Sequence, residues 1–541
     1  KFKHSKKPNK LSLSSEQEKS LKEITSNDEK FRVHVIQGTT GSGKTIVYFN
    51  SLKKKIDEGF QGLILLPEIG LTRDFQKKFL DFFGFEAAIW HSSITKKNKK
   101  IIWSGISTGK IKVIIGARSS LFLPFLKLGL IIVDEEHDQS YKQDEGVIYN
   151  ARDMAISKAS FLNIPINLVT AVPSLETFYN IKKGKFLVTR LHKRYLDAKL
   201  PNHEIIKVNQ GSSKKNLWIS QKIIDKVNEH LNKKDQVLFF VNRRGFSPFV
   251  LCKNCLKPHS CPNCSINLVY HKRKGKLICH YCGFKSSLSR TCEKNKTCEY
   301  IFSGPGVEKV YEEVKNIFNG NKIEIFSSDT MNKKSSTNIL ENIINNKINI
   351  LIGTQLISKG FHFPNLNCII VLDIDLSLRG YDLRVAEKNL QLYHQLSGRA
   401  GRAGKPATVY FQTFKNNSNI ISQITNSDPN KFLEKELDLR RKNSLPPFER
   451  FIAIIISGKK ETKVEELSNH LKEILEKKLN ARILGPVVAP ILKIKNNYRY
   501  RILIRSKKSE NIQKNLSTIL NKFKKQTEIK LVVDVDPISF N

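Results

Sequence analysis

The stretch Val33-His-Val-Ile-Gln-Gly-Thr-Thr-Gly-Ser-Gly-Lys-Thr45 decides the fold of this chain. Residues 33–37 form a short apolar run, and residues 38–45 fit the pattern G-x-x-x-x-G-K-[ST] of a phosphate-binding loop between a strand and a helix. In such a loop the glycines let backbone N–H groups approach phosphates, the Lys reaches the β- and γ-phosphates, and the Thr holds Mg²⁺. A Gly- and Ser-rich turn that binds nothing is the alternative, and the flanking segments disfavour it. The predicted phosphate-binding residues are Gly38, Thr39, Thr40, Gly41, Ser42, Gly43, Lys44 and Thr45.

Short apolar runs of the same kind recur along the chain in two series, with helix-compatible stretches between them. The runs are continuous rather than alternating, which indicates strands buried on both faces, as in parallel sheets covered by helices. Two such series predict two α/β lobes, connected by residues 184–215. The first series is 33–37, 63–66, 113–115, 130–133 and 167–169, and the second is 237–241, 323–326, 348–352, 368–372 and 408–411.

The pattern changes after about residue 416. Residues 451–457, 498–505 and 531–535 are typical of strands, and residues 461–479 of an amphipathic helix. This order predicts a small α+β domain with a split βαβ arrangement.

An acidic box ends one apolar run of the first lobe. Residues 130–133 are followed by Asp134-Glu-Glu-His137, and ligands bind at the carboxyl ends of strands in open α/β sheets. We expect Asp134 to bind Mg²⁺ and Glu135 to activate water. His137 is expected to couple this box to whatever binds nearby. A solvated acidic turn is the alternative, which the intact phosphate loop upstream disfavours.

An arginine box lies in the second lobe, within Gln395-Leu-Ser-Gly-Arg-Ala-Gly-Arg402. Arg399 and Arg402 are three residues apart, and arginine stabilises charge that develops on a γ-phosphate. The pair would complete the site only when the lobes close. A basic turn that contacts solvent or nucleic-acid phosphate is the alternative.

Length and charge narrow the possible classes of protein. At about 150 residues per domain, 541 residues correspond to roughly three to four domains. No apolar run approaches the about 18 residues of a transmembrane helix, and the first ten residues lack the apolar segment of a signal peptide. The 92 Lys and Arg residues against 50 Asp and Glu give a net charge of +42, which suits a polyanionic partner. A composition rich in Lys, Asn and Ile throughout explains this charge equally well.

Eight of the nine cysteines lie between residues 252 and 298, and the ninth, Cys368, is alone in an apolar run. Clustering within a long chain without an export signal indicates metal binding in a reducing cytoplasm rather than disulfides. Three C-x2-C pairs predict zinc, and eight thiolates suit two closed, structural Cys₄ sites. The predicted ligands are Cys252, Cys255, Cys261, Cys264, Cys279, Cys282, Cys292 and Cys298.

Together these motifs resemble those of superfamily 2 helicases, and more narrowly those of the PriA-type primosomal replication-restart helicases. The resemblance covers about residues 13 to 541 and rests on segments that follow the family's order. Besides the loop and the two boxes, these segments are 66–72, 115–120, 140–143 with 149–153, 172–176, 242–245, 304–306, 353–360, 362–364 and 534–537.

The resemblance implies an α/β fold with two RecA-like parallel-sheet helicase lobes, a zinc-binding insertion in the second lobe and a small α+β C-terminal domain. It implies a helicase that uses ATP and Mg²⁺, moves 3′ to 5′ on single-stranded DNA, acts at stalled or repaired replication forks and promotes primosome assembly. The implied partners are single-stranded and forked DNA, primosome and replication-restart proteins and the single-stranded DNA-binding protein, in the cytoplasm and without membrane attachment. An RNA helicase or other translocase, and a DNA-binding primosome scaffold with incidental ATPase activity, are the alternatives.

The resemblance also implies roles for residues outside the three motifs. One group would form a loop that senses single-stranded DNA and signals to the ATP site, because aromatic rings stack on bases while Lys and Arg hold phosphates. A surface loop with core tyrosines is the alternative. The members of this loop are His137, Tyr141, Lys142, Tyr149 and Arg152; Gln17 would contact adenine, and Thr354, Gln355 and Lys359 would line the DNA track or the nucleotide cleft.

The resemblance further implies that the zinc sites are nested. Cys261, Cys264, Cys279 and Cys282 would hold one ion, and Cys252, Cys255, Cys292 and Cys298 the other. The family usually ends this module with C-x2-C, whereas Cys292 and Cys298 have five residues between them. A longer loop could still close the second tetrahedron, or His259 or His280 could substitute.

A second departure concerns the start of the chain. Family members usually carry a module that captures a 3′ DNA end, and a winged helix, before the first lobe, but only 37 residues precede Gly38 here. The chain is expected to be either a fragment or a version without both. The predicted domains are a polar N-terminal segment (1–30), the ATP-binding first lobe (31–195), a linker and the start of the second lobe (196–250), the zinc module (251–300), the rest of the second lobe (301–415) and the C-terminal domain (416–541).

Overall fold

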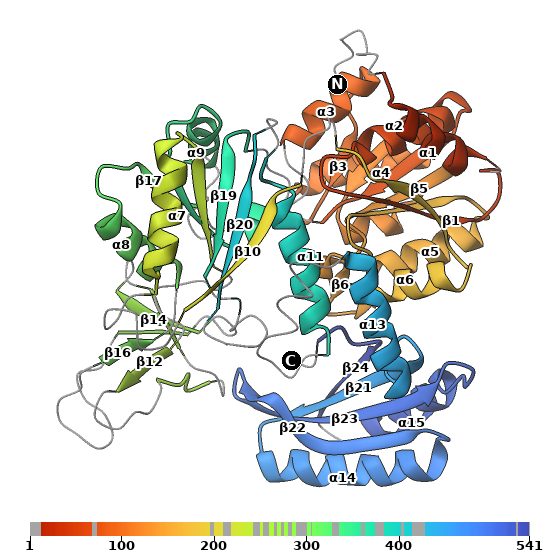
Figure 1. The fold of residues 1–541 in the computed structure, drawn as a ribbon. Coiled ribbons are helices and arrows are strands. Elements are labelled where there is room, and N and C mark those ends of the chain that lie inside the picture. Colours follow the sequence, from red (N-terminus) through yellow and green to blue (C-terminus); the bar gives the residue numbers. More distant parts are fainter. Residues whose placement is uncertain are drawn as a thin grey trace.

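Figure 1 shows the computed structural model of the chain, in which two α/β lobes lie side by side above a smaller C-terminal domain. The structure describes residues 12–26, 28–67, 73–194, 200–208, 218–241, 249–252, 259–263, 268–271, 275–279, 284–287, 300–303, 306–326, 335–358, 363–372, 374, 383–401, 405–413, 428–525 and 529–539. Within these residues no helix is both long enough and apolar enough to cross a membrane.

The first lobe is built on a seven-stranded sheet in the order β3-β4-β2-β5-β8-β1-β9, with parallel pairing throughout. Val35 and Ile36, neighbours on β1, are both fully buried but belong to two different apolar clusters, one on each face of the sheet. Burial on both faces is why these strands are continuously apolar, as predicted. The strands are β1 (Val33–Gly38), β2 (Gln61–Leu65), β3 (Ala88–Trp90), β4 (Val113–Gly116), β5 (Leu128–Asp134), β8 (Ile166–Thr170) and β9 (Leu187–Leu191), and the helices are α1 (Ser15–Thr25), α2 (Lys44–Asp57), α3 (Arg73–Phe83), α4 (Lys96–Ser107), α5 (Ala151–Phe161) and α6 (Leu175–Lys182).

The second lobe is built on a six-stranded sheet in the order β10-β20-β19-β11-β18-β17, again with parallel pairing. Phe239 and Phe240 on β11 repeat the arrangement of the first lobe, because each is fully buried in a different cluster. Its strands are β10 (Asn202–Lys207), β11 (Gln236–Phe240), β17 (Ile323–Phe326), β18 (Ile350–Gly353), β19 (Leu366–Val371) and β20 (Thr408–Thr413), and its helices are α7 (Gln221–Asn232), α8 (Val307–Ile317), α9 (Ser335–Ile344) and α11 (Val385–Ser397).

The segment predicted to connect the lobes contains two strands. β9 forms one edge of the first sheet by pairing with β1, and β10 forms an edge of the second by pairing with β20. The chain therefore crosses between the lobes after Leu191 and before Asn202. The polar N-terminal segment likewise contains α1, whose Ile24 is buried in the first lobe's core.

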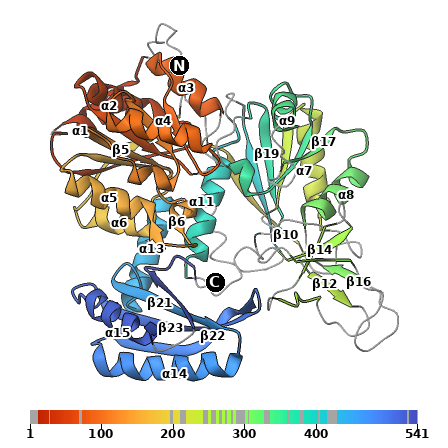
Figure 2. The same cartoon turned by 180° about the vertical axis from the view of Figure 1, so that it is seen from behind.

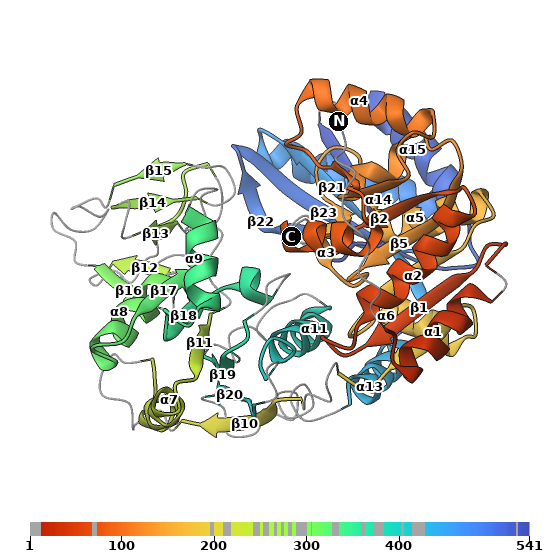
Figure 3. The ribbon, with the colours of Figure 1, turned by 90° about the horizontal axis from the view of Figure 1, so that it is seen from above.

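Two small antiparallel sheets belong to the region of the predicted zinc module (251–300): the first is formed by strands at its two ends and extends beyond both bounds, and the second lies inside it. One pairs β12 (Phe249–Cys252) with β16 (Tyr300–Ser303), and the other joins β13 (Val269–His271), β14 (Lys276–Ile278) and β15 (Lys285–Ser286). Figures 1 and 3 both show them on the side of the second lobe, away from the first.

The C-terminal domain has an antiparallel sheet in the order β22-β23-β21-β24, covered by two helices. The predicted strands at β21, β23 and β24 and the helix at α14 are confirmed, but the sequence pattern missed β22. Pro486 and Pro490 interrupt that strand, and its pairing with β23 shifts register there. Proline removes a ladder hydrogen bond, which is why such a run was not predicted as a strand. The elements are β21 (Glu449–Gly458), α14 (Glu461–Lys478), β22 (Arg482–Ile494), β23 (Asn497–Lys507), α15 (Gln513–Lys525) and β24 (Lys530–Val535).

Helix α13 (Pro429–Lys442) joins the second lobe to the C-terminal domain in the sequence, yet it packs against the first lobe. Figure 2 shows it between α6 and the C-terminal sheet. Lys182 on α6 pairs with Glu434 on α13, and Gln37 at the end of β1 donates to Asn430 over 3.0 Å. The C-terminal domain is therefore anchored to the lobe that carries the phosphate loop.

We expect Phe49→Ala to destabilise the first lobe by about 3–5 kcal/mol, because it empties the centre of an aromatic cluster. Phe49, 2% exposed, packs against Phe75, Phe79, Phe82 and Phe83 with ring centroids 5.3–5.8 Å apart. Urea unfolding followed by tryptophan fluorescence measures the effect. The matched control is Phe161→Ala, whose ring is 90% exposed and whose change is expected to stay within about 0.5 kcal/mol. Equal shifts in both variants would contradict the assigned cluster.

Candidate nucleotide site between the lobes

The predicted phosphate loop turns from the end of β1 into α2. Gly41 and Gly43 have φ of +92° and +81°, a backbone region in which glycine is not penalised. Lys44 Nζ donates to the carbonyl oxygens of Gly38 at 2.7 Å and Thr39 at 3.1 Å, so the ammonium lies across the loop. Thr39 Oγ1 and the Ser42 hydroxyl are buried, and neither has a hydrogen-bond partner in the described part of the chain. Buried hydroxyls beside a loop of this shape fit a phosphate-bearing ligand.

Helix α1 supports the loop through Gln17. This side chain is 7% exposed; its Oε1 accepts from the Ser14 N–H at 3.0 Å, and its Nε2 donates to the Ser42 carbonyl at 3.0 Å. A Cβ on Gly43 would lie 2.3 Å from Gln17 Nε2 and would displace this amide, and the positive φ of Gly43 also disfavours a side chain. Gln17 thus holds the loop backbone, and contact with adenine stays a prediction.

Asp134 ends β5, and β8 separates this strand from β1. Its carboxylate accepts from the Tyr48 hydroxyl at 3.0 Å and from the Glu135 N–H at 2.9 Å. The pKa of Asp134 is raised to about 7, first by burial and then by the charge of Glu135, while Lys44 acts in the opposite direction. A buried carboxylate beside a second one fits a bound cation, and oxygen is the ligand atom that Mg²⁺ prefers.

Glu135 reaches from the acidic box toward the second lobe. Its φ of +49° is unusual for a residue with a side chain. Gln395 on α11 donates to its carboxylate over 3.3 Å and lies 3.0 Å from His137 Nε2, and His137 Nδ1 lies 2.7 Å from the Thr170 hydroxyl at the end of β8. The acidic box therefore touches the helix that leads into the arginine box.

Glu136 is a site residue that the sequence analysis did not single out. It is 1% exposed and accepts from the Ser174 N–H at 2.7 Å, the Thr177 hydroxyl at 2.9 Å and Arg152 Nη1 at 3.1 Å. Glu136 joins the acidic box to the segment 172–176. Separating it from its partners would leave a buried charge without compensation, which is strongly destabilising. Nothing in the local sequence distinguishes it from Glu135, because its partners come from other parts of the chain.

The arginine box lies directly beyond the end of α11. Arg399 is 8% exposed; burial lowers the pKa of its guanidinium, whereas the charge of Glu135 raises it. A Cβ on Gly398 would lie 2.3 Å from Thr40 Cβ, so the box meets the phosphate loop itself. The structure thus brings together Lys44, Asp134, Glu135 and Arg399, while Arg402 lies outside the described residues.

The residues of the expected DNA-sensing loop are mostly buried, which differs from the exposed positions that base stacking requires. Tyr141, 1% exposed, donates its hydroxyl to the carbonyls of Asp134 at 2.6 Å and Leu65 at 3.0 Å. Arg152 is paired with Glu136 and Asp153. Tyr149 is partly exposed, and its ring lies edge-on to Phe122, which is 55% exposed.

Lys142, a further residue of this group, contacts the C-terminal domain. It begins the short hairpin β6 (Lys142–Gln143) and β7 (Tyr149–Asn150), and its side chain is 3% exposed. Its Nζ donates to the Val535 carbonyl at 2.9 Å and forms a 2.5 Å ion pair with Asp534 on β24. The phosphate contact expected of Lys142 therefore competes with an acid of the same chain.

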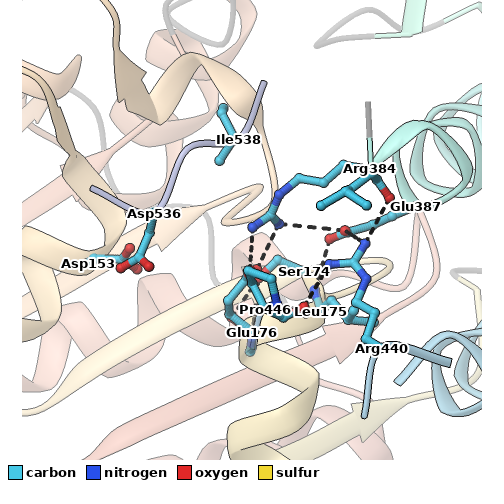
Figure 4. A network of polar contacts seen from close by, with 12 residues as sticks. Asp153, Ser174, Leu175, Glu176, Arg384, Glu387, Arg440, Pro446, Asp536 and Ile538 are labelled. Atoms are coloured by element: carbon cyan, nitrogen blue, oxygen red, sulfur yellow. Dashed lines mark hydrogen bonds and ion pairs between the residues drawn. The ribbon is translucent and has the colours of Figure 1, made fainter. Parts of the chain in front are cut away.

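A second polar network ties α11 and α13 to the first lobe (Figure 4). Glu176 pairs with Arg384, while Glu387 accepts from the Leu175 N–H at 2.9 Å and from Arg440 at 3.5 Å. Burial acts to raise the pKa of Glu176, but Arg384 lowers it well below its usual range. The pair of Glu176 and Arg384 therefore stays ionised near neutral pH. Together with the bonds of Glu387, it fixes the orientation of the two helices.

Three more residues are predicted to line the DNA track or the nucleotide cleft, and the structure describes two of them. Thr354 is buried at the end of β18, Gln355 is exposed in the short helix η6 (Gln355–Ser358), and Lys359 lies outside the described residues. Contact with DNA or nucleotide stays a prediction for all three.

Part of the zinc module is described. Cys261 and Cys279, 5% and 0% exposed, share a small apolar cluster with Leu268 and Leu277. Both belong to the same predicted four-cysteine set, and two thiols in one small core fit one closed zinc site. Cys252 is described only as part of β12; Cys255, Cys264, Cys282, Cys292, Cys298 and His280 lie outside the described residues.

Comparisons with known proteins agree with this arrangement. Residues 14–180 match the DEAD/DEAH box helicase family model, residues 261–286 the Cys-rich region of the PriA DNA helicase, and residues 441–538 the C-terminal domain of primosomal protein N. A solved structure of RecG bound to a three-way DNA junction aligns with a TM-score of 0.47 and 17% identity, over 79% of this chain and 47% of that one.

Curated relatives cover almost the whole chain. The replication restart protein PriA of Rickettsia felis is 43% identical over 98% of this chain and 81% of its own length. The replication restart protein PriA of Bacillus subtilis is 33% identical over 98% of this chain and 67% of its own length. With its two parallel-sheet lobes, Cys-rich insertion and C-terminal domain, the chain belongs to the PriA family of replication restart proteins, as its motifs indicate.

Proposed function

We propose that this chain is an ATP-driven DNA helicase of replication restart that moves 3′ to 5′ on single-stranded DNA at stalled or repaired forks. The observation that carries the proposal is the contact of the arginine box with both motifs of the first lobe. Gly398 lies against Thr40 of the phosphate loop, and Gln395 donates to Glu135 of the acidic box. A nucleotide site shared by two lobes couples hydrolysis to their relative movement. The direction of movement and the fork substrate rest on the family resemblance.

The residues divide the chemistry of hydrolysis among them. Lys44 would leave the loop carbonyls for the β- and γ-phosphates, and Arg399 would stabilise charge that develops on the γ-phosphate. Asp134 and Thr45 would hold Mg²⁺, which would supply positive charge beside the phosphates. Glu135 orients the attacking water, and its bond to Gln395 makes its position depend on the second lobe.

The coupling to DNA runs through two adjacent residues. Tyr141 holds the carbonyl of Asp134, and Lys142 begins the hairpin that we propose contacts DNA. A DNA phosphate that draws Lys142 away from Asp534 would therefore move the backbone beside Tyr141, whose hydroxyl donates to the Asp134 carbonyl. Tyr149 and Phe122 supply the partly exposed rings on which a base can stack.

The proposed partners follow from charge and from the family. A net charge of +42 favours single-stranded and forked DNA. Primosome proteins and the single-stranded DNA-binding protein are proposed from the resemblance, with action in the cytoplasm, and two zinc ions are proposed for the eight clustered cysteines.

We expect Lys44→Ala and Arg399→Gln each to lower DNA-stimulated ATP turnover on the order of a hundredfold or more, because each removes charge stabilisation at the phosphates. Steady-state turnover of the full chain, with and without a forked DNA oligonucleotide, measures the loss. Lys53→Ala is the matched control, because Lys53 is an exposed lysine on the same helix as Lys44.

Three results would count against the proposal: two from turnover assays with DNA or RNA, and one from a strand-displacement assay. Full turnover in Lys44→Ala contradicts the assigned site. Equal stimulation by RNA and DNA oligonucleotides of one sequence favours a general translocase. Displacement of strands only from substrates with a 5′ tail on the tracking strand contradicts the proposed direction.

Asp534→Asn is expected to strengthen binding of a single-stranded oligonucleotide about three- to tenfold at low salt, because it removes the carboxylate that competes for Lys142. Fluorescence anisotropy of a labelled oligothymidine measures the affinity. Asp438→Asn changes the net charge equally at an exposed position on α13 and controls for long-range charge. The same shift in both variants, or weaker binding by Asp534→Asn, contradicts competition at Lys142.

Zinc content tests the two proposed sites. The purified chain is expected to hold about two zinc ions, and Cys292→Ser about one, because each closed site needs four ligands. Elemental analysis after dialysis gives the ratio. Cys368→Ser is the matched control, since Cys368 is buried in β19 far along the chain from the cluster. Two ions in Cys292→Ser would show that another residue completes the second site.

A further inference from the structure

Arg194 lies where the chain leaves the first lobe. It follows β9, the edge strand beside β1, and precedes the crossing to β10. The two residues before it are fixed, because the N–H groups of His192 and Lys193 donate to the Glu16 carboxylate at 2.8 and 3.1 Å. Arg194 therefore extends from a firm anchor on α1.

The guanidinium of Arg194 binds both lobes at once. Its Nε donates to the Thr40 carbonyl in the phosphate loop at 3.0 Å. Its Nη2 and Nη1 donate to the carbonyls of Gly398 at 2.9 Å and Ala400 at 3.3 Å in the arginine box. The residue is 6% exposed, so these contacts are shielded from water.

The two carbonyls held in the second lobe belong to the residues on either side of Arg399. Binding Gly398 fixes the peptide plane that leads into Arg399, and binding Ala400 fixes the plane one residue beyond it. With the backbone held on both sides, the direction in which the Arg399 side chain leaves it is restricted. A guanidinium is a rigid planar fork, which a flexible ammonium does not reproduce. Because the same fork also binds Thr40, it relates Arg399 directly to the loop that binds phosphates.

We propose that Arg194 is a positioning residue, which sets Arg399 against the phosphate loop when the lobes close. This inference rests on the proposed function. Separation of the lobes breaks the bonds to Gly398 and Ala400 but leaves Arg194 anchored beside Thr40. Because of Arg194, Arg399 is aligned with the phosphate loop only when the two lobes close. Arg194 lies where the covalent connection between the lobes begins.

The test compares kcat and KM for ATP in the full chain with saturating single-stranded DNA. Arg194→Gln is expected to lower kcat about ten- to hundredfold, the loss that follows when a catalytic group is misplaced by about an ångström. KM is expected to stay within about twofold, because the phosphate loop keeps its own residues. Arg194→Lys keeps the charge but not the fork, so it is expected to lose kcat as well, and it serves as the second variant if Arg194→Gln does not fold.

A double-mutant comparison shows whether Arg194 acts through Arg399. The variant with both Arg194→Gln and Arg399→Gln is expected to be no slower than Arg399→Gln alone. Arg190→Gln, an exposed arginine on β9, is the matched control and is expected to keep the kcat of the unaltered chain.

Several results would overturn the inference. If Arg194→Gln raises KM and leaves kcat unchanged, Arg194 binds nucleotide instead of positioning Arg399. If Arg194→Lys keeps full kcat, only the charge of Arg194 matters. If the losses of the two single variants multiply in the double variant, the two arginines act independently. Reduced turnover in Arg399→Gln beside unchanged turnover in Arg194→Gln contradicts this inference alone. Unchanged turnover in Arg399→Gln contradicts the proposed function instead.

Discussion

The structure depends on how closely other chain segments approach the backbone of the phosphate loop. At Gly43 an added Cβ would lie 2.3 Å from Gln17, and at Gly398 an added Cβ would lie 2.3 Å from Thr40. A side chain at Gly43 would displace the Gln17 amide, and one at Gly398 would collide with Thr40. The loop is therefore in close contact with α1 on one side and with the end of α11 on the other. The nucleotide site consequently exists as a unit only while the two lobes are in contact.

Buried charges extend this contact to the rest of the molecule. Each buried carboxylate costs free energy unless hydrogen-bond donors or cations surround it, and here the partners come from distant segments. Glu136 joins the acidic box to Arg152, Glu176 joins the first lobe to Arg384, and Glu387 joins α11 to Arg440 on α13 (Figure 4). Lys142 completes the series by pairing with Asp534 on the last strand. The C-terminal domain is therefore linked to the acidic box through a short chain of ion pairs and backbone bonds.

Local patterns of apolar residues predicted most of the strands of the two lobes. The continuous apolar strands of both lobes were predictable because each one is buried on both faces, as Val35 and Ile36 show. Strand β22 was missed because Pro486 and Pro490 break the local pattern, although pairing with β23 compensates on either side of them. The burial of Tyr141 was not predictable either: an aromatic residue among polar neighbours suits an exposed loop equally well, and its partners Asp134 and Leu65 are brought to it by the sheet.

By itself the sequence determined what depends on neighbours along the chain: the phosphate loop, the acidic box, the parallel strands, the clustered cysteines and the family. Their chemistry requires fixed residue types at fixed short spacings, and such spacings are visible without a fold. Only the tertiary structure decided which groups meet across long separations, such as Arg194 with Thr40 and Gly398, or Lys142 with Asp534. The physical reason is that a hydrogen bond or an ion pair acts over a few ångströms of space, and sheet order alone brings such distant residues within that reach.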